Sequence, residues 1–365
     1  MEKLLQGLVE VSSWTGDKAG VDAAGAVLCE AMVLPCERKL SERYGDHLVF
    51  HGARRASDQG AVLIGHIDTV FPRDSFSGYR SEGDAAYGPG VLDMKGGLVV
   101  VAFALRALAN VGALDGIPLS VVVVSDEEVG SPDSTEHLRA VAQGARVALG
   151  FESGRPHDEI VTRRKGTGSF TALAHGTAAH AGNAHADGGN AIWSLARFVD
   201  AAQQLTDYDR GVTVNIGTIR GGIGKNTVPS HAEAEGDLRF STREDESRVR
   251  EALLDVAKSS ARPRTKLEVH WGPGRPPMER SAESVGLYEA YAACLRASGL
   301  GAAEMPLVGG GSDAATTSAM DIPSIDALGP RGKGFHTIDE YIEIPTLVTK
   351  AQALVRYLLT HVWQG

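Results

Sequence analysis

Hydrophobic and polar positions follow two different periods along this chain. In the first part, up to about residue 162, short and almost entirely apolar runs alternate with segments whose apolar residues recur at helical spacing. Runs of this kind are typical of strands that are covered on both faces, and they lie at 47–51, 61–65, 119–125 and 147–151. Helical spacing marks residues 1–30 and 98–109. Strands and helices in alternation predict an α/β layered domain.

From about residue 163 the apolar positions alternate with polar ones, which is the period of half-exposed strands. Such strands are expected at 169–174, 212–219 and 232–240, with helices at 191–205 and 244–259. They predict a small α+β sandwich, residues 163–275, inserted into a larger domain formed by 1–162 and 276–365. The stretch from Gly272 to Pro277 is predicted to be the return linker. Helices at 283–298 and 345–362 and a strand near 324–327 complete the larger domain.

Bulk properties narrow the class of protein. A chain of 365 residues exceeds the usual size of a single core, so two domains are expected. The net charge of −10 argues against a nucleic-acid partner. No apolar run approaches the ~20 residues needed to span a bilayer, and the acidic N-terminal segment resembles an amphipathic helix more than a signal peptide. A cytoplasmic protein is therefore expected, with Cys29, Cys36 and Cys294 as free buried thiols.

Five short segments carry acids or histidines, and three of them directly follow a predicted buried strand. They are Gly65–Thr69, Gly90–Gly97, Asp126–Glu128, Phe151–Ser153 and Phe335–Thr337. Two histidines and several carboxylates gathered at one edge of a sheet are the donors that a pair of Zn²⁺-like ions requires. The chain is therefore predicted to be a two-metal hydrolase.

Each segment alone has a simpler interpretation. Asp68, two residues after His66, could cap a turn, and Asp93 could cap the helix that follows it. Glu127 and Glu128 could form a solvated acidic loop, although adjacent carboxylates repel unless they share a cation or a proton.

Taken together, the donors divide into two sets that share one carboxylate, and each set leaves positions open for water. The sets are His66, Asp93 and Glu152, and Asp93, Glu128 and His336.

These segments resemble the motifs of the M20 metallopeptidase family, and most closely its glutamate carboxypeptidase (carboxypeptidase G2-like) branch. The resembling stretches are Gly65–Val70, Gly88–Gly97, Asp126–Ser131, Gly309–Ala314 and His336–Ile344, in the order of the family. The resemblance implies a zinc-exopeptidase type fold, with a mixed, largely parallel sheet, flanking helices and an inserted lid or dimerisation domain.

The resemblance also implies roles for single residues of the larger domain. His66, Asp93, Glu128, Glu152 and His336 match the ligands of a zinc pair, with Asp93 as the bridge and a cis peptide bond after it. Asp68 matches the carboxylate that orients His66. Glu127 matches the general base that takes a proton from a metal-bridging water.

Within the insert, His180 matches the histidine that stabilises the oxyanion, often in the active site of the partner subunit; a surface turn histidine is the alternative. Asn226 and Arg239 match substrate contacts, and Arg239 would grip the free carboxylate. Backbone N–H groups of Gly310, Gly311 and Ser312 could lie beside the same carboxylate. His185 stands in a segment where relatives commonly have a proline, and we interpret it as a loop residue; an extra substrate contact is the alternative.

The sequence therefore predicts a zinc-dependent homodimeric hydrolase, with Co²⁺ or Mn²⁺ as possible substitutes. It would remove a C-terminal amino acid, glutamate by preference, from peptidyl or N-acyl substrates. Two alternatives stay open: an N-acyl-amino-acid deacylase of the acetylornithine deacetylase or aminoacylase type, and a non-catalytic member that binds small ligands.

Overall fold

The computed structural model describes residues 1–364 and divides into two compact units. The first contains residues 1–163, 278–308 and the described residues from 312 onward, and the second contains residues 164–277 together with Gly309–Gly311.

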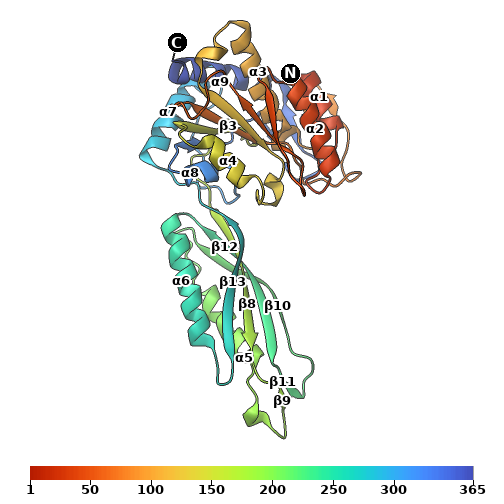
Figure 1. Ribbon diagram of the computed structural model, residues 1–365, viewed down its shortest axis with the longest axis vertical. Helices are drawn as coiled ribbons and strands as arrows, with labels where there is room; N and C mark the ends of the chain where they lie inside the picture. Colours follow the sequence, from red (N-terminus) through yellow and green to blue (C-terminus); the bar gives the residue numbers. More distant parts are fainter. Residues whose placement is uncertain (365) are drawn as a thin grey trace. The chain divides into compact units, whose positions relative to one another are not determined.

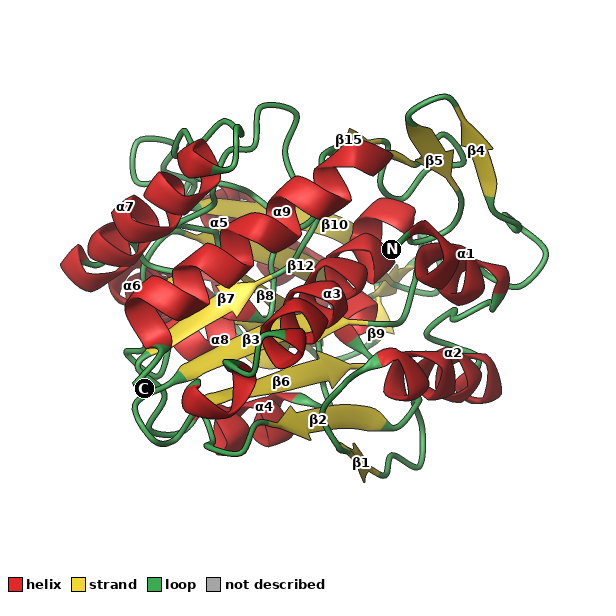
Figure 2. Cartoon of the chain, turned by 90° about the horizontal axis from the view of Figure 1, so that it is seen from above, coloured by secondary structure: helices red, strands yellow, loops and turns green. Residues whose placement is uncertain are grey.

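The first unit is built on a six-stranded sheet in the order β1-β2-β6-β3-β7-β14. Strands β1, β2, β6, β3 and β7 can be followed across this sheet in Figure 2. Strands β6, β3, β7 and β14 are mutually parallel, whereas β1 and β2 run antiparallel at one edge. The mixed, largely parallel sheet that was expected is confirmed. The strand bounds are β1 Cys36–Lys39, β2 His47–His51, β3 Ala61–His66, β6 Leu119–Val124, β7 Val147–Gly150 and β14 Ser324–Ile325.

Helices cover both faces of this sheet because both faces are apolar. Leu63 and Val121 point into the main core, which also holds side chains of the larger helices. Val62 and Val122 point to the opposite face, against Leu138 of α4. The helices are α1 Glu2–Glu10, α2 Lys18–Ala31, α3 Gly96–Asn110, α4 Thr135–Ala142, α7 Ala282–Ala297, α8 Ala314–Ser318 and α9 Ile344–Tyr357.

A second, antiparallel sheet of the first unit has the order β15-β16-β5-β4 and was not expected from the sequence. Its strands are only two or three residues long, which is too short for alternation to be recognised. They are β4 Arg80–Glu82, β5 Ala85–Tyr87, β15 Gly332–Lys333 and β16 Tyr341–Glu343.

The second unit is an antiparallel sheet in the order β10-β12-β8-β13, with a two-stranded ribbon β9-β11 beyond one end (Figure 1). Alternate residues of β8 are buried, and they pack with α5 and α6 in a separate core. The elements are β8 Gly166–His175, β9 Ala179–His180, α5 Ala191–Gln203, β10 Thr213–Gly221, β11 Thr227–Val228, β12 His231–Phe240, α6 Arg243–Ser260 and β13 Lys266–Arg275.

Two expectations are wrong. Strand β13 continues through Gly272–Arg275, where the linker was predicted, because a register shift between Trp271 and Gly274 keeps this glycine- and proline-containing segment paired with β8. Cys29 and Cys36 form a disulfide rather than free thiols, since the end of α2 and the start of β1 bring them together, whereas Cys294 is free and buried.

Among residues 1–364, none of the helices combines the length and the apolar character needed to cross a membrane.

Candidate metal centre

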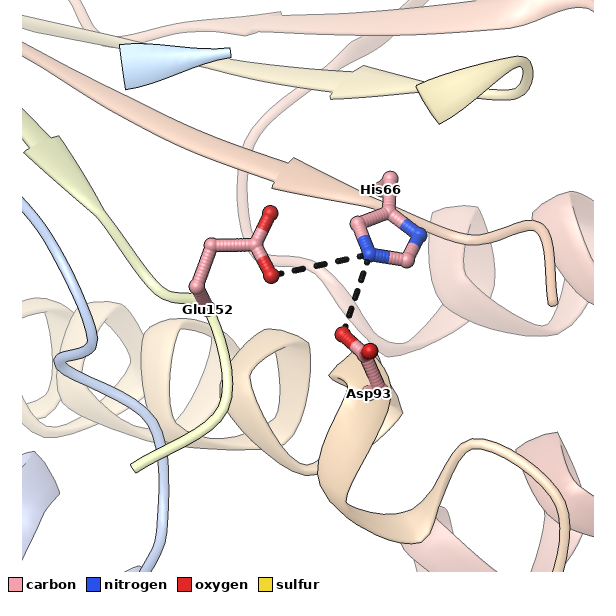
Figure 3. A group of neighbouring side chains, drawn as sticks. All are labelled: His66, Asp93 and Glu152. Carbon is pink, nitrogen blue, oxygen red and sulfur yellow. Dashed lines mark ion pairs between the residues drawn. The ribbon is translucent and has the colours of Figure 1, made fainter. Parts of the chain in front are cut away.

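The first set of donors meets beyond the carboxyl ends of two neighbouring parallel strands. His66 is the last residue of β3, and Glu152 follows β7 by two residues. Nε2 of His66 lies 3.4 Å from Oδ1 of Asp93 and 3.8 Å from Oε2 of Glu152 (Figure 3). The three side chains thus point toward one common point.

Asp93 also belongs to the second set. Its other oxygen, Oδ2, lies 3.2 Å from Nε2 of His336, and the same nitrogen lies 3.2 Å from Oε2 of Glu128. Within each set, one donor atom from each residue lies within 4.8 Å of the others. Asp93 therefore turns one oxygen to each histidine, as a carboxylate that bridges two ions would.

Local backbone geometry places Asp93. It lies in the turn Val91–Lys95, directly after Gly90, whose left-handed φ of 78° suits glycine. The peptide bond between Asp93 and Met94 is cis, which confirms the expectation drawn from the family resemblance.

Burial and mutual contacts shift the pKa values of these side chains. Burial works against protonation of His66, but Glu152, Asp68 and Asp93 nevertheless raise its pKa well above the usual value. Hydrogen bonds with Asp93 and Glu128 raise the pKa of His336 to about 10. Burial raises the pKa of Glu152 to about 7 and also raises the pKa of Glu128. Without a metal, the two imidazolium rings therefore supply the positive charge that the carboxylates need.

The donors fit a pair of divalent cations. Imidazole nitrogen and carboxylate oxygen are ligands that Zn²⁺ accepts, and Co²⁺ and Mn²⁺ also accept them. Three of the five side chains, those of His66, Glu128 and Asp93, are no more than 12% exposed. The three carboxylates among the five, those of Asp93, Glu128 and Glu152, would repel one another at neutral pH once both histidines lose their protons. Cations bound between them would relieve this repulsion.

The neighbourhood of Asp68 differs in detail from the expectation. Nδ1 of His66 lies 3.0 Å from the backbone carbonyl of Asp68 and 3.4 Å from its Oδ1. The buried carboxylate itself accepts hydrogen bonds from the Thr15 hydroxyl, at 2.8 Å, and from the backbone N–H groups of Glu127 and Glu128. Asp68 therefore joins the loop of His66 to the loop of the two glutamates. Thr15 was missed because an isolated threonine carries no motif.

In the second unit, the ribbon β9-β11 brings His180 and Asn226 together. The backbone N–H of Ala181, next to His180, donates to the Asn226 carbonyl. Nδ1 of His180 accepts hydrogen bonds from the backbone N–H groups of Gly182 and Asn183, at 3.1 and 3.0 Å. In a neutral ring this leaves the proton on Nε2, so an exposed N–H donor is held ready. His185 lies in an exposed turn.

Arg239 lies at the opposite end of this sheet. Arg239 lies on β12 and pairs in register with Thr167, near the start of β8. His175 is the last residue of β8, and of all residues in that strand it is nearest in sequence to β9, which contains His180. Nε and Nη2 of Arg239 contact the two carboxylate oxygens of Asp237, at 2.9 and 3.1 Å. One edge of its guanidinium is thus occupied within the unit.

The glycine-rich segment divides between the units. Gly310 and Gly311 cluster with the second unit, where their carbonyls accept hydrogen bonds from Nη1 of the buried Arg164, both at 3.3 Å. The side chain of Arg275 lies against Gly311, where an added Cβ would be 3.1 Å from Cδ of Arg275. Ser312 belongs to the first unit, and its hydroxyl caps Ala314 at the start of α8. Sequence reasoning missed Arg164, which lies two residues before β8, and Arg275, which is the last residue of β13.

Comparisons with known proteins identify the family of this chain. Residues 62–360 match the sequence model of peptidase family M20/M25/M40. Carboxypeptidase G2 of Pseudomonas sp. (strain RS-16) is 28% identical over 368 residues, which cover 98% of this chain and 88% of that protein.

Solved structures show the same fold. A tripeptidase from Staphylococcus aureus superposes with a TM-score of 0.81 at 21% identity, covering 100% of this chain and 98% of the other. A dinuclear metal-binding peptidase from Bacillus subtilis superposes with a TM-score of 0.73 at 14% identity, covering 99% and 97% of the two chains.

Proposed function

This chain belongs to peptidase family M20/M25/M40, and on that premise we propose that it is a zinc-dependent carboxypeptidase. It removes a C-terminal amino acid, glutamate by preference, from peptidyl or N-acyl substrates with a free carboxylate. A metal-dependent peptidase follows from the family and from the similarity to carboxypeptidase G2. The observation that carries the proposal is the double donor set that shares Asp93.

His66, Asp93 and Glu152 would hold one ion, and Asp93, Glu128 and His336 would hold the other, because the donor atoms of each set lie within 4.8 Å of one another. When bound, such ions polarise the scissile carbonyl and make a water nucleophilic near neutral pH. His66 is further oriented by its Nδ1 contact with the Asp68 carbonyl, the kind of outer contact that fixes a ligating ring.

Glu127 is the general base. Its backbone is fixed by the hydrogen bond to Asp68, while its half-buried side chain leaves the loop beside Glu128. A carboxylate oxygen of Glu127 accepts the proton of the attacking water and then returns it to the leaving amine nitrogen.

His180 comes from a second copy of this chain. The carboxylate and the scissile amide of a C-terminal residue lie roughly 4 Å apart. Within one copy, Thr167 at the Arg239 end of β8 and His175 at the β9 end are separated by about eight strand residues, roughly 26 Å. A substrate held at one end therefore cannot reach His180 at the other, which supports a homodimer in which Nε2 of His180 donates to the oxyanion.

The substrate carboxylate is bound at the end of the sheet where Arg239, Arg275 and Gly309–Gly311 lie. Arg239 remains our proposed contact, with the N–H groups of Gly310, Gly311 and Ser312 as further contacts. Asn226 lies beside His180 in the ribbon, so this proposed contact would come from the second copy together with His180. Because Asp237 already occupies one edge of the Arg239 guanidinium, Arg275 is a second candidate for this role.

Amino-acid release measured by mass spectrometry tests the function. The Zn²⁺-loaded protein would be offered peptides, N-acyl amino acids and benzoyl-glutamate, each with a matched methyl ester. Release of glutamate from the benzoyl and peptidyl acids, but not from the esters, supports the carboxypeptidase. Release only from acetylated amino acids would assign a deacylase instead, and no release from any compound would leave a non-catalytic ligand-binding role.

A further inference from the structure

Glu340 is a fully buried acid that the proposed reaction does not use. It lies directly before β16, four residues after His336. Its carboxylate accepts hydrogen bonds from the backbone N–H groups of three residues of the turn around Asp93. The distances are 3.0 Å to Gly90, 2.8 Å to Leu92 and 2.9 Å to Asp93 itself.

These three N–H groups form a concave nest of donors that one anion fills. Gly90 has a left-handed conformation, which turns its N–H toward the same side as the next two donors. Gly90 and Leu92 are buried, so without Glu340 their N–H groups would lose their partner away from water. The turn that carries Asp93 also has a backbone hydrogen bond of its own, from the Lys95 N–H to the Gly90 carbonyl, and Glu340 supplies the acceptor for three further N–H groups, including that of Asp93.

The same residue is tied to the loop of His336. The backbone N–H of Glu340 donates to the Thr337 carbonyl, and the N–H of Thr337 donates to the Gly334 carbonyl. Gly334 has a left-handed φ of 84°, which allows the loop to reverse there. Glu340 thus connects the segment of His336 with the segment of Asp93, whose Oδ2 is 3.2 Å from Nε2 of His336.

We propose that Glu340 is a positioning residue of the metal centre, which sets the direction of the Asp93 carboxylate by holding the backbone of its turn. The inference rests on the proposed dinuclear site. Because Asp93 serves both donor sets, loss of Glu340 weakens the binding of both ions, not of one. The expected loss is about 10- to 100-fold in affinity, as for other groups that orient metal ligands.

The test compares Glu340→Gln and Glu340→Ala with wild type. In Glu340→Gln the amide NH₂ would face backbone N–H donors, so this isosteric change should be nearly as harmful as removal. Asp158→Asn is the matched control, because Asp158 is an equally buried carboxylate of the first unit that pairs with Arg331 and does not contact the Asp93 turn. Zn²⁺ affinity is measured by titration of metal-free protein against a competing chelator, and Tm is measured on the same samples.

Weaker binding of both ions in the Glu340 variants, with wild-type affinity in Asp158→Asn, supports the inference. Affinities within twofold of wild type in both Glu340 variants would overturn it while leaving the proposed function intact. Equal loss of affinity in Asp158→Asn at a similar Tm would also overturn it, as a general stability effect. If the wild-type protein does not bind two ions, the proposed function is overturned as well.

A measurement on the wild type covers the case in which the Glu340 variants do not fold. In the metal-free protein, the amides of Gly90, Leu92 and Asp93 should be protected from hydrogen exchange, because their acceptor is already in place. Protection of all three supports the inference. Exchange as fast as in an unstructured peptide would overturn it.

Discussion

The backbone N–H of Glu127 donates a hydrogen bond to Oδ1 of Asp68, at 3.3 Å. The second oxygen of Asp68 accepts from Glu128 at 3.2 Å, so one buried carboxylate holds the proposed base and a proposed ligand at a fixed spacing. These two contacts are made by the backbone N–H groups of Glu127 and Glu128, so they do not require the Glu127 side chain.

Glu127→Gln should reduce kcat by about 10²- to 10⁴-fold, because an amide cannot accept the proton of the attacking water. Both metals should remain bound, as elemental analysis of the purified variant would show. Glu136→Gln, at an exposed position of α4, is the control and should keep wild-type turnover. Normal turnover of Glu127→Gln would remove the assignment of the base.

Metal stoichiometry should separate the bridge from the terminal ligands. Asp93→Ala should lose both ions. Glu152→Ala and Glu128→Ala should each lower the affinity for one ion by more than ~100-fold, which is the largest loss typical of groups that only orient a metal ligand. Mass spectrometry of the dialysed proteins measures the bound metal. Two ions retained in Asp93→Ala would contradict a shared ligand.

Metal binding should release protons at pH 7. The pKa of His336 is raised to about 10 and that of His66 well above its usual value, so both rings are protonated in the metal-free protein. A ligating ring must be neutral, and apparent affinity should therefore rise with pH between about 6 and 10. Calorimetric titration in buffers of different ionisation enthalpy measures the protons released. Binding heats that do not depend on the buffer would refute the prediction.

Mixing two inactive variants tests whether His180 acts across subunits. In a mixed dimer of Glu127→Ala and His180→Ala, one of the two sites would contain both native residues. After dissociation and reassociation, activity should return to about a quarter of the wild-type value, because about half of the dimers are mixed. Each variant alone, dissociated and reassociated in the same way, is the control and should stay inactive. Lack of any recovery, with mixed dimers shown to be present, would place His180 in its own subunit.

Asp245 should govern the acid stability of the second unit. Its buried carboxylate lies 2.7 Å from Nε of Arg210 and accepts a hydrogen bond from the hydroxyl of Thr242, the N-cap residue of α6. Burial opposes ionisation, but Arg210 and Thr242 nevertheless lower the pKa of Asp245. A lowered pKa gives stability that is complete above about pH 4, the unfolded value, and is lost as pH falls through the folded value.

Asp245→Asn should accordingly destabilise the protein by about 1–3 kcal/mol at pH 7 and by less at pH 3. Thermal unfolding followed by circular dichroism across this pH range gives the comparison. Asp255→Asn, exposed on the same helix, should change Tm little at any pH. A loss that is constant from pH 7 to pH 3 would show that the charge of Asp245 is not responsible.

Local pattern was sufficient for the longer elements and for the chemical types of the donors. The apolar run that becomes β3 ends at His66, and the run that becomes β7 is followed by Glu152, because strands covered on both faces are recognisable from composition alone. Parallel strands then bring their carboxyl ends to one edge. The sequence by itself thus determined the fold class and a set of candidate metal ligands.

Only the tertiary structure decided how those side chains are held. The contacts of Asp93 with His336, of Glu340 with the Asp93 turn and of Asp68 with Glu127 and Thr15 join residues far apart in sequence. The pairing of Arg239 with Asp237 and the distance between the Arg239 and His180 ends of the sheet are equally absent from any local pattern. Such contacts depend on the paths of loops and on strand register, which periodicity along the chain does not encode.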